Sequence, residues 1–474
     1  MTKPPMTKPP MTKAPMTTAE QHIDVVILGG GSGGYACAIR AAQLGLSVTL
    51  IEADKVGGTC LHRGCIPTKA LLHSAEVADS ARTSEQFGVR ASFDGIDIAQ
   101  VHDYKNGTVE RLYSGLQGLL AQHKITIVNG YGTYVGGRSI DVDGTRYTGT
   151  SLVLATGSYP RELPGIELGR RILTSDQALE LDRVPTSATV LGGGVIGVEF
   201  ASLWRSFGAE VTIVEALPRL IAAEDPWSSK QLERAYRKRG IVCKTDTKIV
   251  SAKEAADSVR VELGDGTISD TELLLVAVGR GPRTGGNGFE ENGISLDKGF
   301  VVTDERLRTS VDGVYAVGDI VPGLALAHRG FQQGIFVAEQ IAGKDPIPVA
   351  EHLIPRVTYS HPEVASVGLG EEAARKQYGD VSTVVYDLSG NGKSQILRTT
   401  GGIKVIRSGT RGPVVGVHLV GDRVGELIGE AQLAVAWEAL PDEVGRFIHA
   451  HPSQNEALGE AMLALAGTPL HAHR

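Results

Sequence analysis

The feature that most constrains the fold is a glycine-rich pattern that occurs twice in the chain. Residues 24–53 read as an apolar run, a glycine turn, a segment rich in small residues, and a second apolar run that ends in an acid. Residues 190–216 repeat this order 163 positions further along. A strand, a glycine turn, a helix and a second strand make one βαβ unit, so the duplication predicts two Rossmann-like units.

Each glycine turn predicts a dinucleotide site. The first glycine allows a tight turn, the second lets a pyrophosphate approach the backbone, and the third lets the helix pack close to the strand. An acid at the end of the second strand is placed to bind a ribose hydroxyl. These residues are Gly29, Gly31, Gly34 and Glu52 in the first unit, and Gly192, Gly194, Gly197 and Glu215 in the second. One such motif can be a surface turn, but two with both acids in register indicate cofactor binding.

Composition limits the class of protein. A chain of 474 residues is too long for one ordinary core and suggests roughly three or four domains. It contains no apolar run of the ~18 residues that a membrane span needs. A net charge of -7 offers no basic surface for nucleic acid. We therefore expect small molecules and other proteins as partners, with neither nucleic acid nor membrane among them.

The first 16 residues repeat a five-residue pattern of Met, Thr, Lys and Pro, which predicts a disordered tail with no secretory signal. Four cysteines in so long a chain cannot form a secreted disulfide framework. We therefore expect a cytoplasmic protein whose fold begins near residue 21. In a reducing compartment, a close cysteine pair calls for a catalytic or sensing role.

Cys60 and Cys65 form such a pair, within the segment GGTCLHRGCIPTKALL. Five residues along an ideal helix rise by ~7.5 Å, which exceeds the ~4.4–6.8 Å Cα separation of a disulfide. The segment must therefore be distorted if the two are to bridge. Gly64 supplies backbone freedom, and Pro67 suggests that the regular helix starts near Cys65. A thiol at a helix N-terminus is favoured as thiolate, as redox chemistry requires.

Zinc is the first alternative for this pair. Neither a second cysteine pair nor a suitably spaced histidine pair follows, so we expect no metal site. The other two cysteines, Cys37 and Cys243, fall in an expected helix and an expected strand, where they are predicted to be buried apolar fillers.

Three further segments stand out. Residues 152–165 and 273–284 are apolar strands that end in small-residue turns, as expected where a chain leaves one nucleotide domain and re-enters another. Residues 309–334 hold another strand, then Gly318 and Asp319, and then a helix that starts near Ala327. Asp319 fits a helix cap or turn as well as a functional role.

Near the C-terminus, the segment HAHPSQNEALGEA contains His449, His451 and Glu456. It fits two different interpretations. Either this is a solvated helix start with two surface histidines, or it is an acid/base histidine with a carboxylate partner.

With these motifs in order, the chain resembles the pyridine-nucleotide disulfide oxidoreductase family from about residue 22 onward. The resemblance implies an α/β fold with two Rossmann-like nucleotide-binding domains plus a C-terminal α+β dimerisation domain. The implied ranges are 1–20 for the disordered repeat tail, 21–155 and 285–350 for the two parts of an FAD-binding domain, 156–284 for an NAD-binding domain, and 351–474 for the dimerisation (interface) domain.

The resemblance also implies the cofactors FAD and NAD. FAD would be held by Gly29, Gly31, Gly34, Glu52, Gly157, Asp319 and Ala327, and NAD by Gly192, Gly194, Gly197, Glu215 and Gly279. Lys69 would lie near the flavin, paired with Glu199. Because Glu215 accepts from a ribose 2′-hydroxyl and repels a 2′-phosphate, we expect NAD to be preferred over NADP, although Arg219 nearby could accommodate that phosphate.

Within the family the chain is most similar to the dihydrolipoamide dehydrogenases. That similarity implies a homodimer that oxidises dihydrolipoamide on the lipoyl domains of 2-oxoacid dehydrogenase complexes or of the glycine cleavage system. The substrate thiolate would attack Cys60, and Cys65 would pass the electrons to FAD. His451 would act as the base, and Glu456 would orient it. Under two-fold symmetry, this histidine would enter the partner subunit's site.

The chain departs from the family pattern at three residues, since CLHRGC and HPS replace the common CLNVGC and HPT. The departures are His62, Arg63 and Ser453. Two alternatives stay open. One is an NAD(P)H-dependent reductase of a low-molecular-weight disulfide such as mycothiol disulfide. The other is a non-catalytic flavoprotein subunit or redox sensor, against which the set of Cys60, Cys65, His451 and Glu456 argues.

Overall fold

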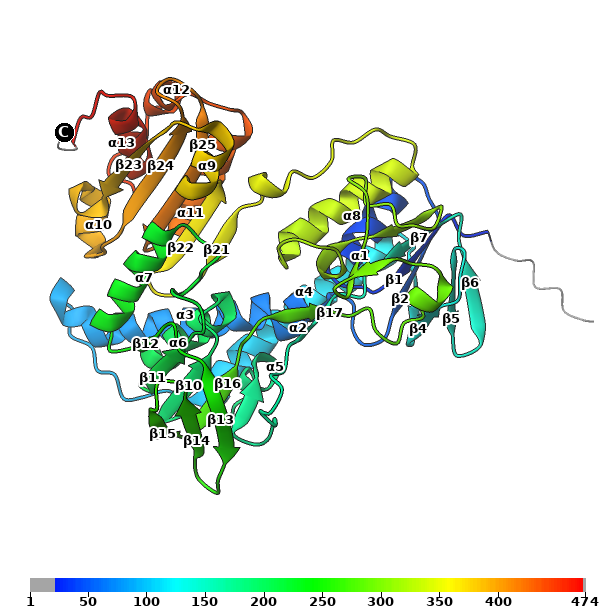
Figure 1. Ribbon diagram of the computed structural model, residues 1–474, viewed down its shortest axis with the longest axis horizontal. Helices are drawn as coiled ribbons and strands as arrows, with labels where there is room; N and C mark the ends of the chain where they lie inside the picture. Colours follow the sequence, from blue (N-terminus) through cyan, green and yellow to red (C-terminus); the bar gives the residue numbers. More distant parts are fainter. Residues whose placement is uncertain (1–21, 472–474) are drawn as a thin grey trace, which may run out of the picture.

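A computed structural model describes residues 22–471 of the chain. In this range the chain forms three five-stranded sheets with helices packed on them (Figure 1). The expected disordered tail at residues 1–20 lies outside the described residues. Between residues 22 and 471, the helices are all too short or too polar to cross a membrane.

The first sheet is parallel, with the strand order β20-β7-β1-β2-β3. Its strands are β1 (Val25–Leu28), β2 (Val48–Glu52), β3 (Thr126–Asn129), β7 (Ser151–Leu154) and β20 (Val314–Ala316). Helix α1 (Ser32–Gln43) follows β1 and packs against α8 (Ala327–Ile341). Segments almost 300 residues apart in sequence therefore belong to one layer, and α8 begins at the residue predicted from the sequence.

The second sheet is also parallel, with the order β12-β11-β10-β16-β9. Its strands are β9 (Ile172–Thr174), β10 (Ser187–Leu191), β11 (Glu210–Val214), β12 (Val242–Lys244) and β16 (Leu273–Val276), and its helices are α5 (Ser175–Ala178), α6 (Val195–Phe207) and α7 (Pro226–Lys238). Strand β10 lies between β11 and β16 as β1 lies between β2 and β7. The predicted duplication of Rossmann-like units is confirmed.

Shorter antiparallel pairings complete these two layers. The strands are β4 (Gly132–Tyr134), β5 (Ser139–Val142) and β6 (Thr145–Thr148); β13 (Ile249–Glu254), β14 (Val259–Leu263) and β15 (Ile268–Thr271); β18 (Leu296–Asp297) and β19 (Phe300–Val301). A last pair, β8 (Ser158–Pro160) and β17 (Arg280–Pro282), follows β7 and β16 directly. The chain therefore leaves the first sheet after β7 and returns toward it after β16. These are the two positions that the segments 152–165 and 273–284 predicted.

The third sheet is antiparallel, with the order β21-β22-β25-β24-β23. Its strands are β21 (Arg356–Thr358), β22 (Glu363–Gly368), β23 (Val381–Asp387), β24 (Gly402–Ser408) and β25 (Val414–Gly421). The helices are α9 (Glu371–Tyr378), α10 (Gly392–Leu397), α11 (Val424–Ala436), α12 (Pro441–Gly445) and α13 (Glu456–Leu465). We refer to residues 356–471 as the C-terminal domain. Its mixture of helices and strands confirms the predicted α+β class.

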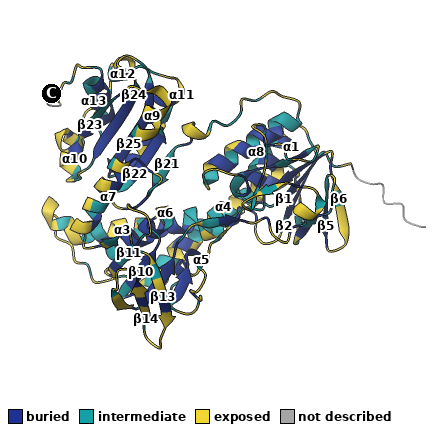
Figure 2. Ribbon diagram, viewed as in Figure 1, coloured by how far each residue is buried: buried dark blue, intermediate teal, exposed yellow. Residues whose placement is uncertain are grey.

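Apolar strands form the core of each sheet. Strands β1, β7, β10 and β16 bury most or all of their residues, and so does β25 of the third sheet. Figure 2 shows the dark, buried strands with exposed residues on the outer faces of the surrounding helices. Continuous apolar strands are typical of parallel sheets that are covered on both faces.

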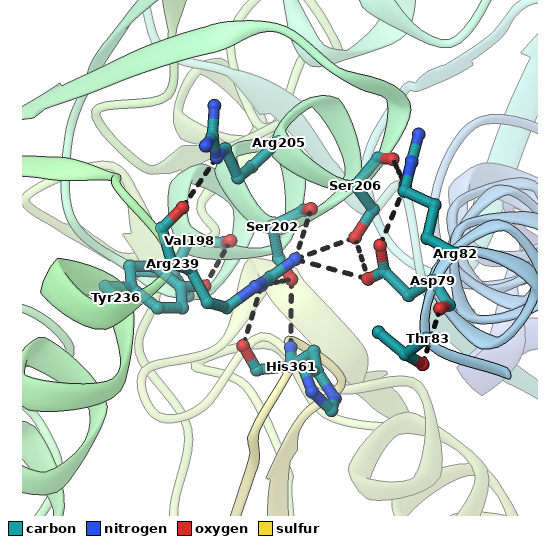
Figure 3. Close-up of polar contacts among 10 residues, drawn as sticks. All are labelled: Asp79, Arg82, Thr83, Val198, Ser202, Arg205, Ser206, Tyr236, Arg239 and His361. Atoms are coloured by element: carbon teal, nitrogen blue, oxygen red, sulfur yellow. Dashed lines mark hydrogen bonds and ion pairs between the residues drawn. The ribbon is translucent and has the colours of Figure 1, made fainter. Parts of the chain in front are cut away.

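Three helices carry the cysteine segment and its supports: α2 (Gly58–Arg63), α3 (Cys65–Thr83) and α4 (Ile98–Gln122). A polar junction ties α3 to α6 (Figure 3). Asp79 of α3 accepts a hydrogen bond from Ser206 of α6 at 2.5 Å, and Arg239 donates to the same serine at 2.7 Å. Arg239 also donates to the carbonyl oxygen of His361 at 2.8 Å. This junction joins all three layers and holds the helix that starts at Cys65.

Candidate active site

The two cysteines lie on either side of a break between two helices. Cys60 is on α2, and Cys65 is the first residue of α3. Gly64 separates the helices, with φ −148° and ψ −110°, and a Cβ there would lie 3.0 Å from the carbonyl oxygen of Thr59. The expected distortion at Gly64 and the helix start at Cys65 are confirmed. Both cysteines are free thiols in this structure.

The two thiols differ in how readily they ionise. The hydrogen bond that Cys60 donates lowers the pKa of Cys65, burial raises it, and the nearby Lys69 ammonium lowers it again, with a net fall to about 7. The pKa of Cys60 is raised instead, because its thiol donates that hydrogen bond and is buried. Cys65 therefore ionises first, and Cys60 stays protonated beside it.

Lys69 lies one helical turn after Cys65 and pairs with Glu199 of α6. Its Nζ lies 2.9 Å and 2.8 Å from the two carboxylate oxygens of Glu199, whose side chain is buried. Burial lowers the pKa of Lys69, but the Glu199 carboxylate raises it by more. The pairing implied by the family resemblance is present in the structure, and it keeps a positive charge beside Cys65.

Tyr359 completes this group, and the sequence contained no signal for it. Its backbone N–H donates to Glu199 at 2.9 Å, and the Lys69 ammonium lies 4.8 Å from the centre of its ring. Tyr359 belongs to the C-terminal domain, whereas Lys69 and Glu199 come from α3 and α6. Three layers therefore meet at the charge beside Cys65.

The first glycine turn has the geometry of a phosphate cradle. Gly29 has φ +103°, and a Cβ there would lie 2.3 Å from the carbonyl oxygen of Ala155. A Cβ on Gly34 would lie 1.8 Å from the carbonyl oxygen of Gly29, so the helix and the turn are in backbone contact. A Cβ on Gly31 would meet nothing within 4 Å. The space at Gly31, beside the N-terminus of α1, therefore fits a diphosphate.

The second turn repeats these three features. Gly192 has φ +108°, and a Cβ there would lie 2.4 Å from the carbonyl oxygen of Ala277. A Cβ on Gly197 would lie 1.9 Å from the carbonyl oxygen of Gly192, and one on Gly194 would meet nothing within 4 Å. The duplicated sequence has folded into duplicated cradles, each open at its middle glycine.

Each cradle is bordered by its acid in the same way. Glu52 accepts from the backbone N–H of Gly30 at 2.7 Å, and Glu215 accepts from that of Gly193 at 2.6 Å. The second oxygen of each carboxylate accepts from the residue two positions later, at 2.8 Å and 2.7 Å. Both carboxylates are thus held at the rim of a cradle, where a ribose would lie. Ribose binding by these acids stays a prediction.

Asp319 lies in a short 3-10 turn (η3, Gly318–Ile320), several residues before the cap of α8. It accepts a hydrogen bond from the Ser158 hydroxyl at 2.5 Å, and that hydroxyl accepts from Arg280 Nε at 2.7 Å. Asp319 is therefore not the N-cap of α8, and its carboxylate belongs to a polar cluster where the two Rossmann layers meet. Ser158 and Arg280 are members of this cluster that the sequence did not reveal.

Two glycines beside this cluster were also expected to contact a cofactor. Gly157 has φ +75° and Gly279 has φ +109°, and a Cβ at either would meet nothing within 4 Å. Both turns therefore need glycine for their backbone and border open space. Their contact with a cofactor stays a prediction.

His451 is anchored by Glu456, the first residue of α13. Its Nδ1 lies 2.8 Å from Glu456 Oε1, while Glu456 Oε2 accepts from the Ser453 backbone N–H at 2.7 Å. Burial raises the pKa of Glu456, but these two contacts lower it by more, so it stays ionised. The His451 side chain is 78% exposed. It is oriented yet open to the outside of this chain.

His449 behaves differently from the surface residue of the first interpretation. Its side chain is only 12% exposed, and its Nε2 lies 2.8 Å from Glu430 of α11. The expectation of two surface histidines is therefore wrong for His449, because α11 covers it. Among the described residues, no polar contact of this chain joins His451 to either cysteine, and α13 lies in a different domain from α2 (Figure 1).

Two of the three departures from the family pattern have side-chain partners close to them in sequence. His62 Nε2 lies 2.9 Å from the carbonyl oxygen of Val56, and Arg63 pairs with Asp54 at 2.5 Å. The hydroxyl of Ser453 is buried without a hydrogen-bond partner among the described residues. Within the described part of the chain, no hydrogen bond or ion pair links these three residues to each other.

Family models match the chain in two blocks. Residues 23–334 match the pyridine nucleotide-disulphide oxidoreductase model, and residues 354–462 match the dimerisation domain of the same family. Together they cover nearly all of the described residues.

Curated proteins similar to the chain include the dihydrolipoyl dehydrogenase of Bacillus subtilis, 38% identical over 94% of this chain and 99% of that protein. The mitochondrial dihydrolipoyl dehydrogenase of Pisum sativum is also 38% identical, over 94% and 92%. Similar solved structures include LpdA from Mycobacterium tuberculosis, with a TM-score of 0.87, 26% identity and coverage of 94% and 99%. Another is the HOCl-induced flavoprotein disulfide reductase RclA from Escherichia coli, with a TM-score of 0.83, 27% identity and coverage of 93% and 99%.

Proposed function

Because the chain belongs to the pyridine nucleotide-disulphide oxidoreductase family, we propose that it is a dihydrolipoyl dehydrogenase, which oxidises dihydrolipoamide to lipoamide and reduces NAD⁺ to NADH. The observation that carries the proposal is the thiol pair: Cys60 and Cys65 lie on either side of the helix break at Gly64. The Lys69–Glu199 ion pair lies one helical turn further along, and the Lys69 ammonium favours the Cys65 thiolate. The dihydrolipoyl dehydrogenases among its relatives support the choice of substrate.

The two cradles suit two dinucleotides. FAD would be held by Gly29, Gly31, Gly34, Glu52, Gly157, Asp319 and Ala327, with the Lys69–Glu199 pair near the flavin. NAD would be held by Gly192, Gly194, Gly197, Glu215 and Gly279. Support comes from the open space at Gly31 and Gly194, each beside a helix N-terminus that attracts phosphate. When bound, the flavin supplies a two-electron acceptor for the dithiol and a hydride donor for the nicotinamide.

The chain's own residues perform the thiol exchange. In the oxidised enzyme, His451 of the partner subunit takes the proton of one substrate thiol, and the resulting thiolate attacks the sulfur of Cys60. The Cys60–Cys65 bond breaks, and Cys65 leaves as the thiolate that Lys69 stabilises. The second substrate thiol then attacks the sulfur bound to Cys60. The proton of the second thiol passes to the Cys60 sulfur as lipoamide leaves, and the histidine keeps the proton of the first thiol. The substrate loses two electrons as its disulfide forms, and the enzyme gains them as the Cys60–Cys65 bond breaks.

A homodimer would bring this histidine to the cysteines. The dimerisation domain of the family covers residues 354–462, and His451 is exposed and oriented by Glu456. Under two-fold symmetry, each site would take its cysteines from one subunit and its histidine from the other. The lipoyl domains of a 2-oxoacid dehydrogenase complex or of glycine cleavage would be the partners. The domain ranges implied by the family resemblance are part of this proposal. A cytoplasmic location stays a prediction.

NADH formation from dihydrolipoamide tests the activity. We expect turnover in the holoenzyme, a preference for NAD⁺ over NADP⁺, and loss of turnover in Cys60→Ser with the flavin retained. A holoenzyme that fails with dihydrolipoamide but reduces a low-molecular-weight disulfide with NADPH would replace this function by the reductase alternative.

Co-expression of two inactive variants tests the shared site. Cys60→Ser and His451→Ala homodimers should each be nearly inactive, but a mixed dimer contains one site built from unmutated residues. With random pairing, about a quarter of wild-type turnover should return. Verified mixed dimers without recovery would show that His451 is not the partner's base.

A further inference from the structure

The loop that closes the second cradle, residues 215–225, contains a strained residue. Ile221 has φ +42°, a region that β-branched residues avoid. Its backbone N–H donates to the carbonyl oxygen of Gly193 at 2.7 Å, so this conformation holds the loop against the cradle. Such strain persists only where the surroundings enforce it.

The preceding residue, Leu220, shows which packing depends on the conformation of Ile221. Leu220 is fully buried, and a Cβ on Gly193 would lie 2.5 Å from its side chain and 3.1 Å from that of Glu215. Leu220 therefore packs against the cradle at Gly193, where Glu215 also lies. If Ile221 relaxed, the contact to Gly193 and the packing beside Glu215 would loosen together.

The enforcement comes from the C-terminal domain. Three residues after Ile221, Glu224 pairs with Arg356 of β21 at 3.0 Å and accepts from the Ser366 hydroxyl of β22 at 2.5 Å. The Glu224 backbone N–H donates to the carbonyl oxygen of Ile221 at 2.8 Å. The strained residue is thus one hydrogen bond away from an ion pair with another domain.

Asp225 is held even more tightly. Both of its oxygens accept from Lys404 of β24, at 2.9 Å and 3.0 Å, and they also accept from the backbone N–H groups of Trp227 and Glu371, at 2.9 Å each. The Asp225 side chain is fully buried, and that of Lys404 is 8% exposed. Asp225 is also the N-cap of α7, which Figure 1 shows between the second and third sheets.

The burial of the Asp225–Lys404 pair predicts what loss of the lysine would do. A buried carboxylate that loses its cation is left without charge compensation, so it must move or draw in water. Either response would shift Asp225 and Glu224, and with them the loop that carries Ile221, Leu220 and Glu215.

We propose that Lys404, together with Arg356 and Ser366, is a positioning residue for the second dinucleotide site. Through Glu224 and Asp225, these residues of the C-terminal domain keep the loop of residues 215–225 closed on Gly193, and they thereby set the affinity for NAD(H). This inference rests on the proposed function only in assigning NAD(H) to the second cradle.

The direct test compares Lys404→Met with a matched change on the same domain, Lys376→Met, at an exposed position of α9. We measure the Kd for NADH by titration of the dimeric holoenzyme, and the KM values for NAD⁺ and dihydrolipoamide. Lys404→Met should raise the Kd for NADH about 10-fold or more, with the KM for dihydrolipoamide within about twofold and the flavin retained. Lys404→Arg should restore most of the affinity, and Lys376→Met should match wild type.

Ser366→Ala is a second test, which applies even if Lys404→Met does not fold. It removes one hydroxyl donor to Glu224 and should raise the Kd for NADH about fivefold. An unchanged Kd in a folded Lys404→Met or in Ser366→Ala would overturn the inference. So would a parallel rise in the KM for dihydrolipoamide or loss of flavin, since either would show a general structural role.

The outcomes separate this inference from the proposed function. A wild-type enzyme that binds NADH but does not oxidise dihydrolipoamide contradicts the proposed substrate, and the Kd comparison still decides the role of Lys404. An active wild type with unchanged Kd values in the variants contradicts only the inference. A wild type that does not bind NADH contradicts both.

Discussion

The two Rossmann-like units have the same cradle but different closures. In the first, Gly57 N–H donates to the carbonyl oxygen of Gly30 at 2.8 Å, as Ile221 N–H does to Gly193 in the second. Gly57 has φ +107°, which glycine adopts without strain. The loop of the first unit then runs into α2 and the cysteines. In the second unit, an isoleucine takes the strained conformation, and the loop runs into buried charges.

The neighbouring helices differ as well. Helix α1 of the first unit packs against α8 so closely that a Cβ on Gly334 would lie 2.2 Å from the carbonyl oxygen of Gly33. That closure is backbone against backbone, within one layer. The second unit is closed by Asp225 and Lys404, which belong to different domains. The comparison teaches that matching glycine turns fix where a dinucleotide would bind. The residues packed around each turn decide how firmly the turn itself is held.

The strongest way to separate the two units is a matched pair of aspartates, Gly31→Asp and Gly194→Asp. Both glycines have extended backbones with open space at the Cβ, so the fold should tolerate the change. The added carboxylate would repel a phosphate. Gly31→Asp should purify without flavin, whereas Gly194→Asp should keep its flavin and bind NADH about 100-fold more weakly. Absorbance of the purified proteins and NADH titration decide this.

Gly31→Ala and Gly194→Ala serve as controls, because they add a side chain without charge. A Gly194→Asp protein that also loses its flavin would contradict the assignment of separate sites.

The next effect concerns the acid of the second unit. Glu215→Ala removes the carboxylate expected to accept from the ribose 2′-hydroxyl, and it also releases the backbone N–H of Gly193. We expect kcat/KM with NAD⁺ to fall about 10-fold or more and kcat/KM with NADP⁺ to rise, since repulsion of the 2′-phosphate is lost. Glu52→Ala is the comparison in the first unit, and it should leave the ratio of the two coenzymes unchanged. Wild-type kcat/KM equal or better with NADP⁺ would contradict the role of Glu215.

The third prediction compares the cysteine of each Rossmann-like unit, Cys37 and Cys243, with the thiol of Cys65. Burial raises the pKa of Cys37 on α1 and of Cys243 on β12 to about 12. Alkylation of the reduced enzyme should therefore follow Cys65, with a midpoint near pH 7. In Cys60→Ala, the lost hydrogen bond should move the midpoint toward about 8.5 and slow alkylation at neutral pH about 10-fold.

Lys69→Met should shift the midpoint in the same direction, because the Lys69 ammonium also favours the thiolate. Mass spectrometry of the alkylated peptides identifies the site. Faster labelling of Cys60 than of Cys65 would reverse the roles that we assign.

The smallest expected effect is a pH dependence of the free energy of unfolding, caused by His418 near Asp225. Burial lowers the pKa of His418 on β25 to about 4, below the ~6.5 of an exposed histidine in the unfolded chain. Between these values the unfolded chain binds more protons, so the free energy of unfolding falls as the pH drops from 6.5 toward 4. By pH 5.5 the loss should be about 1 kcal/mol. His418→Gln should flatten this part of the profile, measured by denaturant unfolding at several pH values. A slope unchanged by this substitution would show that another group titrates.

Much of the fold could be predicted because its signals are local. Glycines at fixed spacing, apolar runs and a proline after Cys65 each act within one strand, turn or helix, and the structure places α3 and α8 where these signals indicated. The duplication extended the reasoning to a second unit. Where two local interpretations were equally good, as for Asp319, only the structure could show that the residue is not a helix cap.

The candidate site was predictable only in part. The cysteine pair and the glycine cradles are contained in short segments, but the charge beside Cys65 is not. The Lys69–Glu199 pair joins residues 130 positions apart, and it was expected from family resemblance alone. Tyr359, Ser158 and Arg280 had no sequence signal, because their roles arise from the layers that meet around them.

The sequence by itself determined the two Rossmann-like units, the position of the thiol pair and the choice of residues that can hold phosphate, because backbone sterics and hydrophobic periodicity act over a few residues. The sequence also favoured Cys65 as the thiolate, because the helix starts there. The tertiary structure alone decided which buried charge lies beside that thiol and what closes each cradle. Those properties depend on burial and on charges from other layers: Lys404 reaches Asp225 across 179 residues of sequence. Electrostatic interaction strengthens as water is excluded, so packing decides these properties.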